Sequence, residues 1–261
     1  MAKHMALKKK RRLKSKKRTQ KMSQKKIALL IVFILLFVYS AFQVGYWIYS
    51  NINLSKQDEE IKEQAKVIKQ DEKSQEIETV DFTKLKEINQ DVVGWIKIAN
   101  TNIDYPILQT NDNAFYLKRD IYKQYSSCGS IFMDYRNNKQ FTDNNTVIFG
   151  HNLTLGKMFS DLQKILKGEL GNEIYIDIDI ENKRKEYKVF SSYQTEPVEE
   201  PITINIKDSK EFIDNALKNS QIDFQTVPNE QDSMITLSTC DNTGKQRIIV
   251  HAVEFLEKDL H

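Results

Sequence analysis

Residues 234–255 read MITLSTCDNTGKQRIIVHAVEF, two apolar runs separated by a short polar stretch. Both runs, 234–239 and 247–255, are rich in apolar and β-branched side chains, which is typical of strands. The residues between them include the Asn, Asp and Gly that favour a turn. This part of the sequence therefore predicts a β-hairpin. In such a hairpin Cys240, at the end of the first strand, and Arg247, at the start of the second, lie at the same end of the sheet.

Six further short runs rich in Ile, Val, Tyr and Phe precede this hairpin. They are residues 94–98, 103–108, 130–135, 146–150, 173–180 and 186–194. Helical patterns interrupt them at 157–166 and 209–220, and a short helix with Asp81 as its N-cap is expected before the first strand. Eight strands with a few helices predict a mainly β fold whose strands form a closed or half-closed barrel.

The basic residues are concentrated at the N-terminus. Of the 39 Lys and Arg residues, 13 lie within residues 1–26, which contain none of the 36 Asp and Glu residues. The remainder therefore has a formal net charge of −10, although the whole chain carries +3. Because a nucleic-acid-binding fold normally spreads its basic residues over the folded surface, this distribution argues against nucleic acid as a partner.

The segment from Ile27 to Tyr49 contains no charged residue. As a helix, it would span roughly 34 Å, enough for the ~30 Å hydrocarbon core of a bilayer. The preceding positive charges predict that the N-terminus stays in the cytoplasm and the rest lies outside. The alternative is a cleaved signal peptide with a small-residue pattern at Ser40–Ala41. The apolar stretch exceeds the roughly 7–15 residues of a signal h-region, which favours an uncleaved anchor.

The sequence thus predicts four regions. A basic cytoplasmic tail (1–26) precedes a transmembrane signal-anchor (27–49), which is followed by a stalk (50–80) and an extracytoplasmic catalytic domain (81–261). The stalk is dense in Lys, Glu, Gln and Asp, a composition that suits an exposed helix with i,i+4 charge pairs or a solvated tether. The chain is therefore expected in the cell membrane, crossing it once.

Few residues in 81–261 can support nucleophilic catalysis. The candidates are two cysteines and three histidines: Cys128, Cys240, His151, His251 and His261. The sequence has no CxxC, HxH or HExxH spacing and no GxGxxG or Walker loop, so neither a metal nor a nucleotide cofactor is expected.

Cys240 lies at a strand end beside a loop, where a substrate can reach its thiol. His151 follows another apolar strand in a Gly–His–Asn step and can act as general acid and base. Arg247 can donate hydrogen bonds to an oxyanion on a carbonyl that the thiolate attacks. Cys128 is the rival nucleophile and is interpreted as a packing residue. His251 is interpreted as a packed strand histidine, which leaves His151 as the base.

Residues 236–240, TLSTC, resemble the TLxTC signature of sortases, the membrane-anchored cysteine transpeptidases of Gram-positive bacteria. The order His, Cys, Arg along the chain is the same, and the resemblance spans about residues 81–256 together with the anchor. The helix at 209–220 and the stretches 112–117 and 128–137 are similar to those of class B sortases.

This resemblance implies an eight-stranded sortase barrel with a helix before the seventh strand and a two-step acyl transfer. The Cys240 thiolate would attack the Thr carbonyl of a C-terminal sorting motif on a secreted protein, with Arg247 guiding the substrate and His151 protonating the leaving amine. An amine of a peptidoglycan precursor or cross-bridge would then resolve the thioester and anchor the protein to the cell wall. The motif is left open between NPxTN-like and PxTG-like pentapeptides.

The resemblance also implies a substrate groove. The matching residues are Asn113, Tyr116, Leu117, Ser238 and Thr239. The backbone N–H of Asp241 is expected to join the oxyanion hole. Two other functions stay open: a cysteine endopeptidase that releases its product to water, and a non-catalytic stalked domain that binds peptide or wall polymer.

Overall fold

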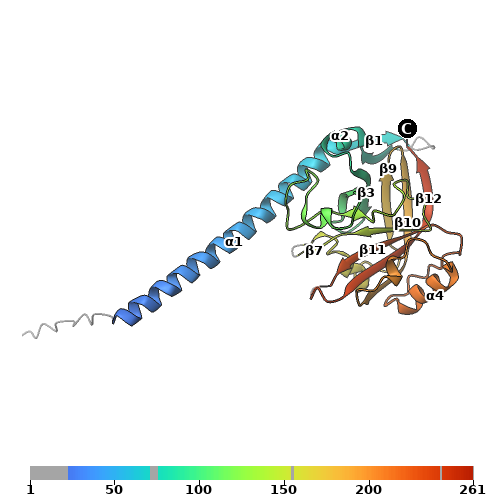
Figure 1. The fold of residues 1–261 in the computed structure, drawn as a ribbon. Helices are drawn as coiled ribbons and strands as arrows, with labels where there is room; N and C mark the ends of the chain where they lie inside the picture. Colours follow the sequence, from blue (N-terminus) through green and yellow to red (C-terminus); the bar gives the residue numbers. More distant parts are fainter. Residues whose placement is uncertain (1–22, 71–75, 154–155, 242, 261) are drawn as a thin grey trace, which may run out of the picture. The chain divides into compact units, whose positions relative to one another are not determined.

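The computed structural model describes residues 23–70, 76–153, 156–241 and 243–260 (Figure 1). The chain divides into two compact units, Met1–Gln57 and Asp58–His261. Most of the predicted basic tail, residues 1–26, lies outside the described residues.

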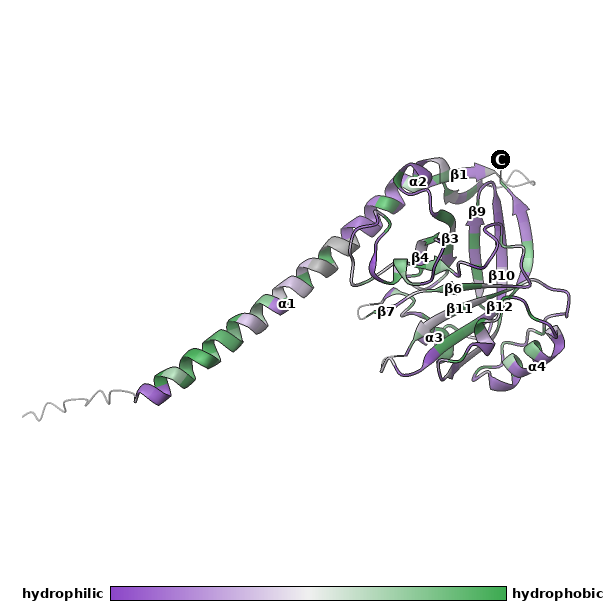
Figure 2. Ribbon diagram, viewed as in Figure 1, coloured by the Kyte–Doolittle hydropathy of each residue, from purple (hydrophilic) through white to green (hydrophobic). Residues whose placement is uncertain are grey.

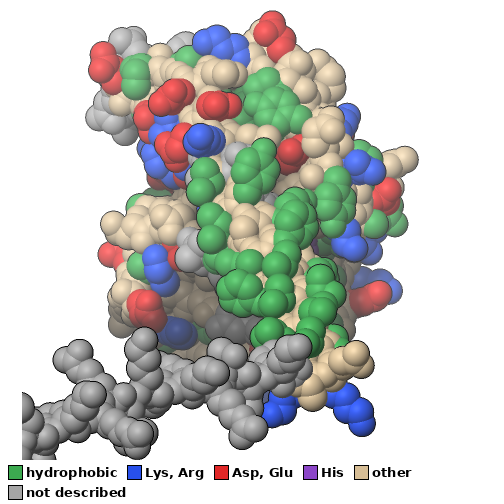
Figure 3. All heavy atoms as spheres, turned by 90° about the vertical axis from the view of Figure 1, so that its left-hand side faces the viewer, with side chains coloured by type: hydrophobic (Ala, Val, Ile, Leu, Met, Phe, Trp, Pro, Cys, Tyr) green, Lys and Arg blue, Asp and Glu red, His purple; other side chains and the backbone are tan. Residues whose placement is uncertain are grey.

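From Gln24 onward, the described residues of the first unit belong to the long helix α1, Gln24–Ala65. The most apolar 18 residues of its segment Gln24–Tyr49 have a mean hydropathy of 2.7, and none of them is buried. The helix is hydrophobic in this segment and becomes hydrophilic further along (Figure 2), and its apolar side chains form a large exposed surface (Figure 3). A helix that is apolar on all sides and this long is a candidate membrane span.

In the second unit, α1 leads into a two-stranded hairpin. Strand β1, Lys66–Gln70, pairs with β2, Glu76–Val80, in antiparallel register from Lys66 opposite Val80 to Gln70 opposite Glu76. Thr79 and Val80 are buried, each 3% exposed. The compact unit thus begins at Asp58, inside the segment that the sequence suggested as a stalk. The hairpin has few apolar residues and many charged ones, so its sequence does not show the apolar–polar alternation that predicts a strand.

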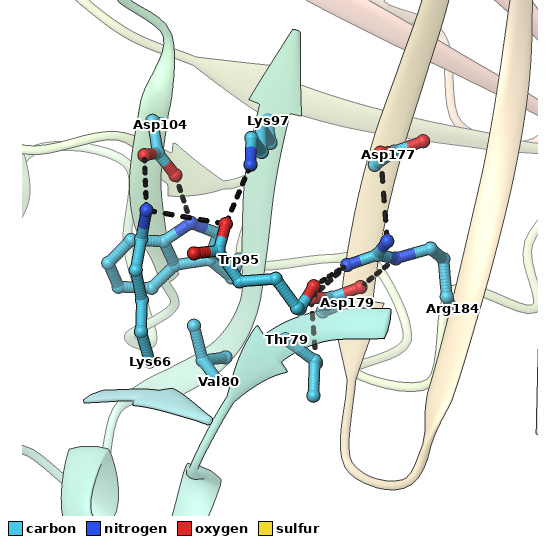
Figure 4. A pocket seen from close by; sticks show the side chains of 10 residues that line it. Lys66, Thr79, Val80, Trp95, Lys97, Asp104, Asp177, Asp179 and Arg184 are labelled. Carbon is cyan, nitrogen blue, oxygen red and sulfur yellow. Dashed lines mark hydrogen bonds and ion pairs between the residues drawn. The ribbon is translucent and has the colours of Figure 1, made fainter. Parts of the chain in front are cut away.

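Ion pairs and hydrogen bonds join this hairpin to the neighbouring barrel strands (Figure 4). The Arg184 guanidinium donates to the Asp179 carboxylate at 2.6 and 2.9 Å and to the Glu78 carbonyl at 2.6 Å. Thr79 donates to the same carboxylate at 2.8 Å, and Lys97 pairs with the Glu78 side chain at 3.0 Å. Because Asp179 is only 4% exposed, its charge depends on these partners.

The short helix α2, Phe82–Ile88, begins at the predicted N-cap. The Asp81 carboxylate accepts hydrogen bonds from the backbone N–H groups of Thr83 and Lys84 at 3.0 and 3.3 Å. These bonds satisfy two of the donors that every helix start leaves without a backbone partner. Phe82 and Leu85 are buried and pack in a cluster with Trp95 of the first barrel strand.

Eight strands form a closed barrel in the spatial order β10-β12-β11-β6-β5-β4-β3-β9. They are β3 Val92–Ile98, β4 Asp104–Leu108, β5 Phe132–Met133, β6 Asn145–Phe149, β9 Tyr175–Ile180, β10 Lys183–Thr195, β11 Met234–Cys240 and β12 Arg247–Asp259. Each coincides with one of the eight predicted strands, and the barrel prediction is confirmed. Most pairs are antiparallel, whereas β6 pairs with β11, and β4 with β5, in parallel.

The predicted helix 157–166 is confirmed only in its second half. Helix α3 covers Leu162–Leu166, while Lys157–Met158 form strand β8, which pairs with β7, Asn152–Leu153. Two short 3₁₀ helices occur at Phe115–Lys118 (η1) and Glu200–Ile202 (η2). The β7–β8 hairpin follows β6 directly, so it lies at the end of the sheet where the predicted site residues meet.

Helix α4, Ser209–Asn219, lies between β10 and β11, before the seventh barrel strand, as predicted. Its buried side chains Phe212, Ile213 and Ala216 form a hydrophobic cluster with residues of β10, β11 and β12, among them Phe190 and Val253. The Asp208 carboxylate caps its N-terminus by accepting from the Glu211 N–H at 2.9 Å. This helix thereby packs against β10, β11 and β12, and its Phe212 contacts the His251 ring.

Candidate active site

Cys240 and Arg247 lie directly opposite each other at one end of the β11–β12 pair. The Arg247 side chain donates a hydrogen bond through Nη1 to the Cys240 sulfur. Both residues are half-buried, so the thiol and the guanidinium share one partly accessible position. The structure therefore brings the predicted nucleophile and the predicted oxyanion-stabilising group into contact, as the hairpin pattern indicated.

His151 reaches the same end of the sheet from β6. Because β6 and β11 are parallel, with Phe149 opposite Ser238, the residues after Phe149 emerge beside the end of β11. The backbone N–H of Gly150 donates to the Ser238 carbonyl at 3.2 Å, and the Asn152 side-chain amide donates to the Cys240 carbonyl at 2.8 Å. His151 thus lies between two residues that are bonded to β11, the strand that ends at Cys240.

The His151 ring is held in a defined orientation. Its Nε2 lies 2.7 Å from the backbone carbonyl oxygen of Leu117 in η1. A carbonyl only accepts hydrogen bonds, so Nε2 carries the hydrogen, and Nδ1 is the nitrogen available for proton transfer. Gly129, at φ +59°, packs beside this ring: a Cβ there would lie 2.7 Å from the Leu117 carbonyl oxygen and 2.9 Å from His151 Cδ2.

The residues predicted to line a substrate groove occupy different environments. Leu117 is 39% exposed next to the His151 ring. Ser238 and Thr239 are almost completely buried, and the Thr239 hydroxyl is among the few buried polar atoms of the described residues that lack a hydrogen-bond partner. Leu117 thus has the most accessible side chain of the predicted set.

Asn113 and Tyr116 make their polar contacts within the fold. The Asn113 amide donates to the Asp134 carboxylate at 2.8 Å, and its oxygen accepts from the Tyr135 backbone N–H at 3.0 Å. Tyr116 is 1% exposed, and its hydroxyl donates to the Asp91 carboxylate at 2.7 Å. Both side chains fix the 113–117 segment whose end contacts His151.

Asp241 forms the turn that follows Cys240. Its backbone N–H donates to the Gln246 carbonyl at 2.9 Å, and its carboxylate accepts from the backbone N–H groups of Lys245 and Gln246 at 3.0 and 3.1 Å. The N–H that was expected in the oxyanion hole is therefore bonded inside the turn. These contacts close the β11–β12 hairpin and fix the spacing between Cys240 and Arg247.

The rival residues are both enclosed. Cys128 is 8% exposed, and burial raises the pKa of its thiol. His251 has no exposed surface, and burial lowers its pKa to about 3. Both cysteines are free thiols. At neutral pH, therefore, Cys128 stays a thiol and His251 stays neutral.

His251 belongs to a buried chain of hydrogen bonds across four strands. Thr236 donates to the Asn145 oxygen at 2.8 Å, so its own oxygen accepts from His251 Nδ1 at 2.9 Å. Nε2 of the same ring then accepts from the Tyr193 hydroxyl at 3.1 Å. The Asn145 amide continues the chain to the Thr203 carbonyl at 2.9 Å. Both ring nitrogens are occupied, which makes His251 a structural residue.

Two functional candidates were not foreseen from the sequence. Asn152 and Gly129 both contact the predicted machinery, one at the Cys240 carbonyl and the other at the His151 ring. The Gly–His–Asn step contained Asn152, but its bond partner lies 88 residues away along the chain. Only the parallel pairing of β6 with β11, which local periodicity does not specify, brings the two together.

The chain matches a known family and solved structures. The sortase domain model matches residues 96–255. Sortase B of Listeria monocytogenes is 33% identical over 222 residues, which cover 82% of this chain and 89% of the relative. Sortase B of Staphylococcus aureus is 35% identical over 188 residues, which cover 69% and 77%.

The fold comparison agrees. The structure of sortase B from B. anthracis in complex with AAEK1 has a TM-score of 0.68 and 30% identity, covering 79% of this chain and 98% of that one. The shared barrel with its helices and the sequence identity along most of the chain together assign the chain to one family. This chain belongs to the sortase family of cell-wall-sorting transpeptidases, and within it to the class B sortases.

Proposed function

We propose that this chain cleaves a C-terminal sorting motif at its Thr residue and transfers the acyl group, through a thioester on Cys240, to an amine of the cell-wall peptide. The contact between the Arg247 guanidinium and the Cys240 sulfur, beside a histidine loop bonded to the same strand, is the observation that carries the proposal. Solved sortase B structures similar to this chain include a substrate complex from Staphylococcus aureus and a sortase B complex with triglycine, which supports a peptide donor and an amine acceptor.

The first half-reaction forms the acyl-enzyme. The Cys240 thiolate attacks the Thr carbonyl carbon, and the Arg247 guanidinium donates hydrogen bonds to the oxygen that becomes negative. Protonated Nδ1 of His151 gives its proton to the departing nitrogen as the carbon–nitrogen bond breaks. The products are a thioester on Cys240 and a free amine on the released fragment.

The second half-reaction reverses these roles. Neutral His151 accepts a proton from the incoming amine, whose nitrogen attacks the thioester carbon. The carbon–sulfur bond breaks, Cys240 leaves as a thiolate, and a new amide joins the sorted protein to the acceptor. Among the predicted groove residues, Leu117, Ser238 and Thr239 lie nearest this chemistry, while Asn113 and Tyr116 hold the segment that carries Leu117.

The experiment combines fluorogenic peptides of the NPxTN-like and PxTG-like types with an added amine, glycine oligomers or diaminopimelate. We expect cleavage by the full chain, with an aminolysis product detected by mass spectrometry. Cys240→Ala should abolish cleavage, and Cys128→Ala is the matched control that should keep it. Full activity in Cys240→Ala would overturn the proposal, and a product distribution that ignores the amine would identify a peptidase instead.

We also propose that residues 27–49 anchor the enzyme in the cell membrane, with residues 1–26 in the cytoplasm. Residues 50–80 connect this anchor to an extracytoplasmic domain, 81–261, and from Asp58 onward they already belong to the compact unit of that domain. The charge-free helix and the basic residues before it support this orientation. External protease added to protoplasts should degrade the domain while leaving an epitope tag on the N-terminus intact. Protection of the domain until the membrane is permeabilised would reverse the orientation.

A further inference from the structure

The hydrogen bonds between β6 and β11 differ at the end of the pair that lies next to Cys240. In a parallel pair, alternate residues of one strand donate to carbonyls of the other. Gly150 donates its backbone N–H to Ser238 at 3.2 Å, so the next donor along the ladder would be the backbone N–H of residue 152, and the next acceptor the Cys240 carbonyl. The register of β6 with β11 ends at Phe149 opposite Ser238, and Asn152 instead lies opposite Met158 in the β7–β8 hairpin. The backbone ladder therefore stops one rung before the nucleophile.

The Asn152 side chain supplies the missing rung. Its Nδ2 donates to the Cys240 carbonyl at 2.8 Å, and the residue is half-buried. The two anchored residues, Gly150 and Asn152, flank His151, whose ring is held from the other side by the Leu117 carbonyl at 2.7 Å. The backbone carrying the imidazole and the backbone carrying the thiol are thus joined by one side-chain amide.

We propose that Asn152 is a positioning residue for acyl transfer, whose side-chain amide extends the β6–β11 ladder to Cys240 and so sets the placement of the thiol relative to the His151 ring. The inference rests on the proposed function for its consequence in catalysis. Asn152 acts through the backbone of Cys240, at the carbonyl that its amide holds. A displacement of about 1 Å between reacting groups is enough to lower the rate about 100-fold.

Two substitutions separate positioning from general stability. Asn152→Ala removes the donor, while Asn152→Asp keeps the shape but places a carboxylate oxygen against the Cys240 carbonyl oxygen. We expect kcat for peptide cleavage by the full chain to fall about 10- to 100-fold in both, with KM changed much less. The Asp variant should be the slower of the two at pH 7.5, and the ratio of its rate to that of the Ala variant should rise as the pH falls towards 5, because a protonated carboxyl donates again.

Gln90→Glu provides the matched control. The Gln90 amide donates to the Lys86 carbonyl at 2.6 Å at an exposed position, so the same chemical change is made away from the site. This variant should keep the wild-type kcat and thermal stability. Wild-type kcat in both Asn152 variants would overturn the inference. An Asp-to-Ala rate ratio that does not change with pH would also overturn it, and this second outcome counts even if both variants are less stable than the wild type.

A second measurement does not depend on turnover. The rate at which iodoacetamide alkylates Cys240, quantified on the Cys240 peptide, requires no substrate. Asn152→Asp should slow it about tenfold at pH 7.5, because a neighbouring carboxylate disfavours the thiolate, whereas Gln90→Glu should leave it unchanged. If the wild type transfers no peptide, the proposed function fails while this comparison still decides the placement of Asn152. Equal alkylation rates in wild type and Asn152→Asp would refute that placement.

Discussion

The buried His251 makes the stability of the fold depend on pH. Its ring has no exposed surface, and burial lowers its pKa to about 3, whereas an unfolded histidine titrates near 6.5. Between these values the unfolded chain binds a proton that the folded chain does not. The contribution of neutral His251 to the free energy of unfolding is therefore fully present above about pH 6.5, and it decreases as the pH falls towards 3.

The magnitude follows from the same two pKa values. At pH 4.5, about 2 units below the unfolded pKa and still above the folded one, proton linkage lowers the free energy of unfolding by about 2–3 kcal/mol relative to pH 7.5. For a domain of this size, each kcal/mol moves the unfolding midpoint by about 2–4 °C. The contribution of His251 should therefore lower the midpoint by about 5–10 °C over this pH range.

His251→Gln isolates this contribution from those of other titrating groups. A Gln amide has an acceptor for the Tyr193 hydroxyl and a donor for Thr236, but it does not titrate. It loses the ring contacts with Phe190 and Phe212, so we expect the variant to be less stable by about 1–3 kcal/mol at pH 7.5.

The assay is thermal unfolding of the detergent-solubilised full chain, followed by circular dichroism at several pH values between 4.5 and 7.5. The gap between wild type and His251→Gln should shrink as the pH falls, because only the wild type binds the extra proton on unfolding. Parallel curves over the whole range would refute the reasoning, since they would mean that His251 titrates alike in the folded and unfolded chains.

Three further substitutions test other parts of the structure. Gly129→Ala places a Cβ 2.7 Å from two backbone carbonyl oxygens at a φ of +59°. Thermal unfolding should show a loss of about 2–4 kcal/mol, and peptide cleavage should slow because the same Cβ displaces the His151 ring. Arg184→Met leaves the buried Asp179 carboxylate without its ion partner and should lower the free energy of unfolding in denaturant by about 3–5 kcal/mol. Adding Asp179→Leu to this variant should recover part of the loss. If it recovers nothing, the ion-pair explanation is contradicted. Asp81→Ala removes the cap of α2 and should cost about 1 kcal/mol, with Asp81→Asn as the control that keeps most of it.

The strands of the barrel were predictable because their periodicity is local. Alternating apolar residues in 173–180 and 234–239, for example, coincide with β9 and β11. The contact between Cys240 and Arg247 was also predictable, since a hairpin with a short turn places the end of one strand opposite the start of the next. The N-cap at Asp81 follows from its own side chain. Each of these features depends on residues close together in the sequence.

Features that depend on distant partners were not predictable in this way. The hairpin 66–80 has the composition of a solvated stalk because its charged residues find their ion partners on barrel strands more than a dozen residues away, such as Lys97 for Glu78 and Asp104 for Lys66. The Tyr116 hydroxyl likewise finds its acceptor, the Asp91 carboxylate, 25 residues away along the chain. A pattern of residue types does not specify which distant group satisfies a polar side chain.

The arrangement of the three predicted catalytic residues follows from strand direction. His151 follows the end of β6, and Cys240 is the last residue of β11. Because these two strands are parallel, both residues lie at the same edge of the sheet. Because β11 and β12 are antiparallel, that edge is also where β12 begins, at Arg247. The parallel pairing therefore brings together residues that are far apart in the sequence, 88 positions from Asn152 to Cys240, whereas the antiparallel pairing joins Cys240 to Arg247 across a separation of only 7 positions. It follows that the geometry is most sensitive at the parallel pair, where no turn joins the two strands, and the bonds from Gly150 and Asn152 are what hold their ends in register.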